Sequence, residues 1–252
     1  MKRDVEIRTA DGTAQAAIFR PSGGAGKAGV LFYMDAFGPR PALDAMAERL
    51  AGQGYAVLVP DLFYRNAPYG PFDAKTAFAE EKTRAKLTGL ISGTTQELTV
   101  RDGQAFVEFL SKEGIGRIGA VGYCMGGARA LNAAAAYPDR IAAAASFHGG
   151  NLASDAPDSP HRRAVDMKGR VYVGCAGVDR SFPPEQSARL AEALRVAEVD
   201  HTIENYVGMQ HGWCVPDHGV YDQAGAERHW RRLTAFFAEA LGAGRRRGGV
   251  RA

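Results

Sequence analysis

The sequence lacks any apolar run close to the roughly 18–20 residues that a membrane-spanning helix requires. Its first eight residues are charged and alternate like a β-strand, which is not the pattern of a secretory signal. Cysteine is scarce: the three residues show no CxxC or Cys/His spacing, which excludes a disulfide framework and disfavours a zinc site. We therefore expect a cytoplasmic protein that does not bind membranes.

Charge is modest in amount and uneven in distribution. Apolar residues make up 46% of the chain and charged residues 23%, as in a globular protein with a sizeable core. We predict one domain over residues 1–241, then a basic, disordered tail over residues 242–252, and no nucleic-acid partner. Much of the net charge of +3 comes from four arginines among glycines near the end of the chain: Arg245, Arg246, Arg247 and Arg251.

Segments typical of buried strands alternate with segments of helical periodicity from residue 29 onward. This order predicts an α/β fold with a mostly parallel, twisted sheet of about eight strands and helices on both faces. In such sheets functional residues gather outside the carboxyl ends of the strands. The expected strands are 5–9 and 16–20 (a hairpin joined at Asp11-Gly12), 29–34, 55–59, 115–121, 141–147, 171–176 and 201–206. The expected helices are 41–53, 73–87, 97–112, 125–137, 183–197 and 222–241.

A G-x-C-x-G motif centred on Cys124 joins one of these strands to the next helix. It is the thiol counterpart of the G-x-S-x-G nucleophile elbow. The strained turn brings the residues two before and two after the nucleophile together, and Gly122 and Gly126 avoid the clash. The helix start favours the attacking thiolate and directs the Met125 N–H toward a developing oxyanion. We predict that Cys124 is the nucleophile; the glycines disfavour the alternative of a buried packing cysteine.

A nucleophile on this turn needs a proton acceptor, and the expected chain order is nucleophile, acid, histidine. Asp179 and His211 each follow a predicted strand, so both belong at the edge of the sheet that carries Cys124. Histidine titrates near neutrality, and aspartate fixes its orientation. Two alternatives remain open: His148 also ends a strand, and Asp179 could instead cap the helix expected at 183–197.

The loop after the strand at residues 29–34 is expected to complete the oxyanion hole. Loops in this position usually supply a second N–H, here that of Ala36. Asp35 lies in the same loop, and a carboxylate near the thiol is unexpected unless the two interact. We therefore expect Asp35 to modulate the thiol, with a purely loop-stabilising role as the alternative.

With these residues assembled, the chain resembles the dienelactone hydrolase (carboxymethylenebutenolidase) family of α/β-hydrolases over roughly residues 5–241. The resemblance implies an enzyme without metal or cofactor, monomeric or homodimeric, that cleaves small carboxylic esters or lactones. It also implies a Cys–His–Asp triad acting through a thioester acyl-enzyme. The motifs that carry the resemblance are Gly122-Tyr123-Cys124-Met125-Gly126-Gly127, the Asp179 loop, Gln210-His211-Gly212 and Val59-Pro60-Asp61-Leu62-Phe63-Tyr64.

Two positions depart from the family pattern. The family places glutamate where this chain has the shorter Asp35, and it binds the dienelactone carboxylate with two arginines. Arg84 is the match for one of them, whereas Val215 occupies the place of the other. The loss removes charge-assisted bonds worth about 1.5–3 kcal/mol each, which argues against dienelactone itself. We expect Tyr123 to contact substrate, and Trp213 either to line the pocket or to pack.

Other functions remain open from the sequence. A broader carboxylesterase or thioesterase would use the same triad. A non-catalytic binding protein on a hydrolase scaffold is a further alternative, which the intact triad disfavours. A haloalkane dehalogenase would need aspartate in place of Cys124, and a peroxide-sensing thiol would be expected to have a resolving cysteine nearby, which is not evident.

Overall fold

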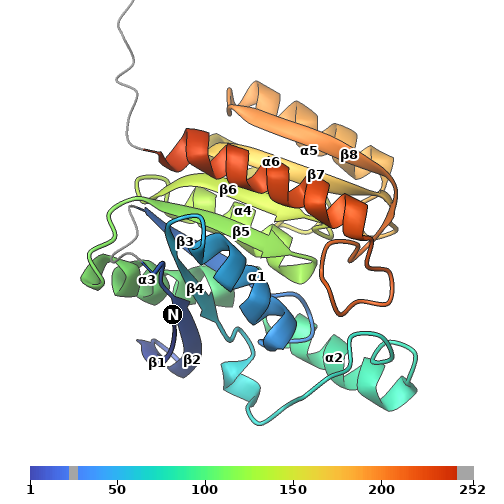
Figure 1. Cartoon of the computed structure of the whole chain (residues 1–252). Helices are drawn as coiled ribbons and strands as arrows, with labels where there is room; N and C mark the ends of the chain where they lie inside the picture. Colours follow the sequence, from blue (N-terminus) through green and yellow to red (C-terminus); the bar gives the residue numbers. More distant parts are fainter. Residues whose placement is uncertain (23–27, 243–252) are drawn as a thin grey trace, which may run out of the picture.

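An eight-stranded sheet forms the centre of the computed structural model, which describes residues 1–22 and 28–242 (Figure 1). The strand order is β1-β2-β4-β3-β5-β6-β7-β8. β1 pairs antiparallel with β2 and β2 with β4, and all other neighbours are parallel. The strands are β1 (Lys2–Thr9), β2 (Gly12–Phe19), β3 (Ala28–Tyr33), β4 (Tyr55–Pro60), β5 (Ile118–Tyr123), β6 (Ile141–Phe147), β7 (Arg170–Val178) and β8 (His201–Gln210).

Helices cover both faces of the sheet. α1 and α6 pack on the front face in Figure 1, and α3 and α4 pack behind it. The α/β fold with a mostly parallel sheet is therefore confirmed. The helices are α1 (Pro41–Ala51), α2 (Glu81–Gly93), α3 (Gln96–Lys112), α4 (Met125–Ala136), α5 (Pro184–Val196) and α6 (Gln223–Leu241), with 3-10 turns η1 (Tyr64–Asn66) and η2 (Pro160–Asp166).

The central strands are apolar along their whole length because helices bury them from both sides. Every residue of β3 and β5 is buried. β6 is a strand although alanine favours helix, and its register between β5 and β7 explains why. Backbone pairing and burial on both sides outweigh the intrinsic preference of its alanines.

The helix predicted at residues 73–87 is displaced in the structure. α2 covers Glu81–Gly93 instead, and the chain before it forms turns. The side chain of Asp73 accepts the Lys75 N–H at 2.8 Å, a local bond that competes with helix formation. The prediction was wrong here because helical periodicity alone does not register such a turn.

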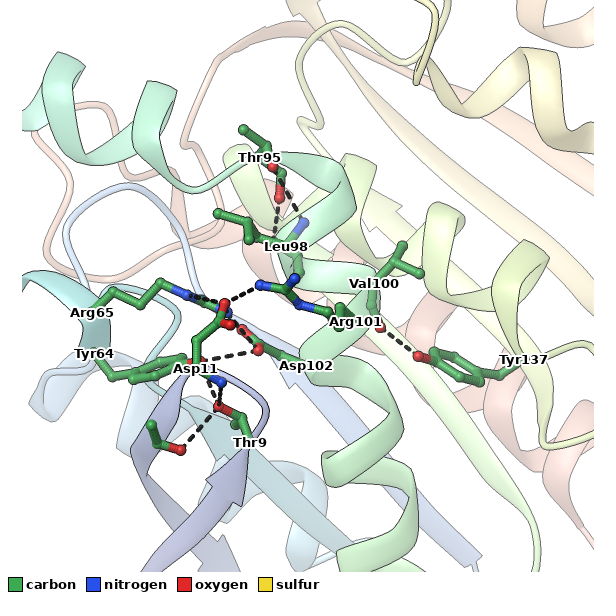
Figure 2. A network of polar contacts seen from close by, with 12 residues as sticks. Thr9, Asp11, Tyr64, Arg65, Thr95, Leu98, Val100, Arg101, Asp102 and Tyr137 are labelled. Atoms are coloured by element: carbon green, nitrogen blue, oxygen red, sulfur yellow. Dashed lines mark hydrogen bonds and ion pairs between the residues drawn. The ribbon is translucent and has the colours of Figure 1, made fainter.

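A polar network ties the N-terminal hairpin to η1 and α3 (Figure 2). Asp11, at the hairpin turn, accepts hydrogen bonds from Arg65 at 2.7 Å and from Arg101. Arg65 also makes two bonds of 2.7 and 2.8 Å to Asp102, which is 1% exposed and also accepts from the Tyr64 hydroxyl at 3.0 Å. This paired geometry is the strong form of an arginine–carboxylate contact, so it fixes α3 against the hairpin.

The first strand and the last helix of the described chain both belong to the central sheet and its helical layers. β1 lies at one edge of the sheet, and α6 packs across β5, β6 and β7. None of the helices within residues 1–22 and 28–242 combines the length and apolarity needed to cross a membrane. The tail expected at 242–252 lies outside the described residues except for Gly242.

Candidate active site

Cys124 stands on a sharp turn between β5 and α4, with backbone angles φ 54° and ψ −118°. A Cβ atom on Gly122 would lie 1.9 Å from the carbonyl oxygen of Gly126. A Cβ atom on Gly126 would lie 2.4 Å from the carbonyl oxygen of Tyr33. Both distances are far below van der Waals contact with rigid backbone, so the turn requires glycine on both sides of Cys124.

The structure brings His211 and Asp179 to this turn from the neighbouring strand ends. His211 directly follows β8, and its Nδ1 lies 2.7 Å from Oδ2 of Asp179. The other carboxylate oxygen of Asp179 accepts the N–H and the hydroxyl of Ser181 at 2.8 and 2.7 Å. Cys124 is close enough to His211 to contribute to the raised pKa of the imidazole. The imidazole is therefore held by an aspartate that is itself fixed in place and lies near the sulfur.

The electrostatics favour a charged imidazole. Burial lowers the pKa of His211, but the negative charge of Cys124 and the hydrogen bond to Asp179 outweigh it and raise the pKa to about 10. Burial raises the pKa of Asp179, but the bonds from His211 and Ser181 outweigh it, and the net pKa is lowered. A charged imidazole paired with the ionised Asp179 is the arrangement that follows.

His148, the rival histidine, contacts the backbone of the nucleophile. Its Nδ1 accepts the Cys124 N–H at 3.1 Å, a donor shared with the carbonyl oxygen of Phe147 at 3.2 Å. Burial and the nearby charges of His211 and His218 lower the pKa of His148 well below its ordinary value. A neutral imidazole therefore lies beneath the elbow, at a residue with the unusual φ of 39°.

Two backbone N–H groups belong to residues that line the cavity beside the sulfur. The N–H groups of Met125 and Ala36 donate to no acceptor among the residues that the structure describes. Both residues line the same cavity as Cys124. Free N–H groups at a helix start and in the loop after β3 are the geometry expected for an oxyanion hole.

Asp35 does not serve the thiol, which corrects the sequence-based expectation. Its carboxylate is fully buried and receives Arg40 through two bonds of 2.7 and 2.8 Å. His218 Nε2 lies 3.0 Å from it, and the Phe37 N–H donates to it at 3.0 Å. Burial raises the pKa of Asp35, but His218 and Arg40 outweigh it and lower the pKa. The ionised Asp35 thus shapes the loop that carries Ala36.

A cavity of about 600 Å³ opens in front of the sulfur. Its volume is that of a small-molecule site. Aromatic and aliphatic side chains form part of the wall, and cations, the triad candidates, neutral polar residues and glycines form the rest. Its lining residues are Ala36, Phe37, Ala74, Lys75, Phe78, Ile91, Gln96, Cys124, Met125, Arg129, Gly150, Asn151, Asp179, Arg180, Ser181, His211, His218, Gly219 and Val220.

Three residues expected to bind substrate lie elsewhere. Tyr123 is fully buried, with its hydroxyl 2.9 Å from Nε2 of His229. Trp213 is also fully buried and packs on the ring of Tyr206 at 4.7 Å. Arg84 is exposed on α2 and is not among the residues lining the cavity. The expectations for Tyr123 and Arg84 are corrected, because the Tyr123 side chain points into the core and Arg84 lies outside the cavity lining. For Trp213 the structure shows the packing alternative.

Sequence reasoning missed one prominent lining residue, Arg129. It is the only charged residue of α4, five positions after Cys124. A single charge in an otherwise alanine-rich helix beside a nucleophile was the available signal. Helical periodicity could have placed it near the cavity, but not decided whether its charge is paired.

The fold and the elbow together define an α/β-hydrolase. The chain belongs to the dienelactone hydrolase family, whose model matches residues 14–241. Among curated relatives, a carboxymethylenebutenolidase of Rhodococcus opacus is 28% identical over 222 residues, covering 85% of this chain and 82% of the relative. A crystal structure of a candidate dienelactone hydrolase from Klebsiella pneumoniae matches with a TM-score of 0.83 at 22% identity, covering 95% of this chain and 98% of that one.

A further solved structure, a dienelactone hydrolase-like promiscuous phosphotriesterase from metagenomic libraries, has a TM-score of 0.79 at 24% identity. It covers 95% of this chain and 98% of its own. Both structural matches support the assignment of the fold, and the family match supports the class of enzyme. The chain is a hydrolase of the dienelactone hydrolase type.

Proposed function

We propose that the protein hydrolyses small carboxylic esters or lactones through a thioester acyl-enzyme on Cys124, with His211 as acid and base and Asp179 as its orienting partner. The observation that supports the proposal is the grouping of Cys124 with His211, whose Nδ1 lies 2.7 Å from Oδ2 of Asp179. It lies at the wall of the cavity of about 600 Å³.

Acylation begins with the thiolate of Cys124. The sulfur attacks the carbonyl carbon, and the electron pair of the C=O bond moves to the oxygen. The N–H groups of Met125 and Ala36 hold this oxyanion, and each such donor is typically worth about 2.7–4 kcal/mol in the transition state. As the tetrahedral intermediate collapses, the imidazolium of His211 gives its proton to the departing alkoxide, and the thioester remains.

Deacylation reverses these roles. The neutral His211 takes a proton from a water molecule, whose oxygen attacks the thioester carbon. The new oxyanion collapses and expels the thiolate of Cys124, which is again paired with the imidazolium. Asp179 stays ionised throughout and holds the Nδ1–H of His211, so the reactive nitrogen always faces the sulfur.

The test is turnover of a panel of p-nitrophenyl esters and lactones by the wild type, Cys124→Ala and the matched control Cys175→Ala. Cys175 is buried in β7, and burial raises its pKa to about 11, so it is a poor nucleophile. We expect Cys124→Ala to abolish turnover and Cys175→Ala to retain it. Mass spectrometry should detect one acyl adduct on Cys124. An unchanged rate in Cys124→Ala would remove this residue from the mechanism.

A further inference from the structure

The cavity wall contains a half-buried positive charge that the proposed mechanism does not use. Arg129 extends from α4 and lines the cavity, and no carboxylate within the described residues lies at ion-pair distance from it. Burial lowers its pKa to about 10, while the charges of Asp158 and Cys124 oppose that shift. A partly desolvated guanidinium without a counter-ion is costly, and proteins seldom retain one without a partner.

The hydrogen bonds of Arg129 leave most of its donors free. Its Nη2 donates to the carbonyl oxygen of Thr94 at 2.5 Å. Its Nε is buried and has no partner in the described chain, and Nη1 likewise makes no bond there. Gln96 is the first residue of α3, two positions after Thr94, and it lines the same cavity. Figure 2 shows the start of this helix next to Thr95. The Oε1 atom of Gln96 is also buried without a partner.

The other unpaired charged residues of the lining are also positive. Lys75 and Arg180 are exposed cations of the lining and form no ion pair within residues 1–22 and 28–242. The carboxylate of the lining, Asp179, is already bonded to His211 and Ser181. A molecule that enters therefore meets a lining with unpaired cations, whose one carboxylate is already bonded.

We propose that Arg129 binds a negatively charged group of the substrate, with Gln96 accepting a hydrogen bond from a neighbouring donor, so that the enzyme selects anionic esters over neutral ones. This inference rests on the proposed ester hydrolysis at Cys124. Arg129 is a different anchor from the two arginine positions implied by the resemblance, since Arg84 lies outside the cavity and Val215 is buried.

The placement also limits the size of the substrate. Five residues along a helix correspond to about 7.5 Å of axial rise from Cys124 to Arg129. A carboxylate bound there shares one cavity of about 600 Å³ with the carbonyl attacked by the sulfur, which favours a small substrate. Short acyl chains that end in a carboxylate meet this requirement, and so do short alcohol portions that carry one.

The experiment compares two esters of equal chain length, p-nitrophenyl butyrate and p-nitrophenyl hemisuccinate, which differ by a methyl group against a carboxylate. A second pair, phenyl acetate and 4-acetoxybenzoate, places the charge on the alcohol portion. We expect Arg129→Met to lower the ratio of kcat/KM for the anionic over the neutral ester by about 10- to 100-fold in at least one pair, mainly through KM. Arg129→Lys should retain part of that ratio.

The matched control is Arg195→Met, which removes one positive charge from the exposed face of α5 and should leave the ratio unchanged. The inference is overturned if Arg129→Met reduces both members of each pair equally, because Arg129 would then only support the Thr94 carbonyl. It is also overturned if the anionic esters are unaffected by both Arg129 variants.

Binding separates this inference from the proposed function. Monomethyl succinate is titrated calorimetrically into Cys124→Ala and into Cys124→Ala/Arg129→Met, neither of which needs to turn over an ester. Binding that weakens at least about tenfold in the second protein supports the anion site even if no ester is hydrolysed by the wild type. Absent or equal binding in the two proteins refutes the anion site and leaves ester hydrolysis by Cys124 to its own test.

Discussion

Replacing Cys124 by alanine should lower the pKa of His211, and the structure sets the scale of the change. In the wild type that pKa is raised from 6.5 to about 10 although burial opposes it. The rise corresponds to about 5 kcal/mol of preference for the imidazolium. Cys124 contributes its charge and a hydrogen bond, and Asp179 contributes the same two effects. Removing a contacting opposite charge typically lowers a pKa by about 1–3 pH units, so we expect a fall of that size.

The assay is a pH titration of the histidine side chains by nuclear magnetic resonance. The sequence has six histidines, and His211→Asn identifies the relevant signal by its disappearance. Cys214→Ala is the matched control because that thiol is 1% exposed and makes no contribution to the pKa of His211. The control should leave the titration midpoint of His211 where it is in the wild type.

A midpoint that stays within about half a pH unit in Cys124→Ala would refute the reasoning. It would mean that Asp179 alone sustains the imidazolium and that the sulfur carries no charge at rest. The thiolate–imidazolium pair would then have to form only after substrate binds. A fall in Cys124→Ala together with a comparable fall in Asp179→Asn would support the arrangement in which both anions hold the proton.

Three further outcomes follow from the same geometry. Because the pKa of His211 is raised, its proton is present below about pH 10 and lost above it, so kcat/KM should fall as pH rises through about 10 in a pH–rate profile. Gly126→Ala should lower the free energy of unfolding by about 1–3 kcal/mol in chemical denaturation and remove most of the activity, because the added Cβ would lie 2.4 Å from a backbone carbonyl oxygen. Gly89→Ala, whose added Cβ would have nothing within 4 Å, should be neutral or stabilising. Asp35→Asn should lower the free energy of unfolding by about 3–5 kcal/mol at neutral pH, and the deficit should shrink in acid, because a carboxylate with a lowered pKa stabilises the fold above its unfolded pKa and loses that effect as pH falls.

The parts of the fold that the sequence predicts are those decided by local steric and burial rules. The central strands read as apolar runs because both faces are covered, and the elbow reads as G-x-C-x-G because backbone atoms occupy the space of any side chain at Gly122 and Gly126. The position of His211 and Asp179 follows from strand direction, since parallel strands end at one edge. These features need no knowledge of distant contacts.

The parts that could not be predicted depend on partners far away in the chain. The orientation of Asp35 is set by His218, 183 positions later, and by Arg40, whose Nε is held in turn by Asp217 at 2.6 Å. Tyr123 lies inside the nucleophile motif, yet its side chain faces the core because it precedes the turn that lifts Cys124 outward. Sequence spacing places such residues near the site but does not decide which way they point.

The contacts of Asp35 with Arg40 and His218 limit its access to the thiol. A carboxylate that accepts two arginine bonds and one histidine bond, with no exposed surface, cannot move to the sulfur without breaking a buried ion pair. In the proposed mechanism the partner of Cys124 is therefore His211, whose raised pKa keeps the imidazole charged at neutral pH. Asp35 instead fixes the loop that carries Ala36, the proposed second donor of the oxyanion hole. The contacts of Asp35 thus support the proposed oxyanion loop, and proton exchange with Cys124 is assigned in that mechanism to His211 alone.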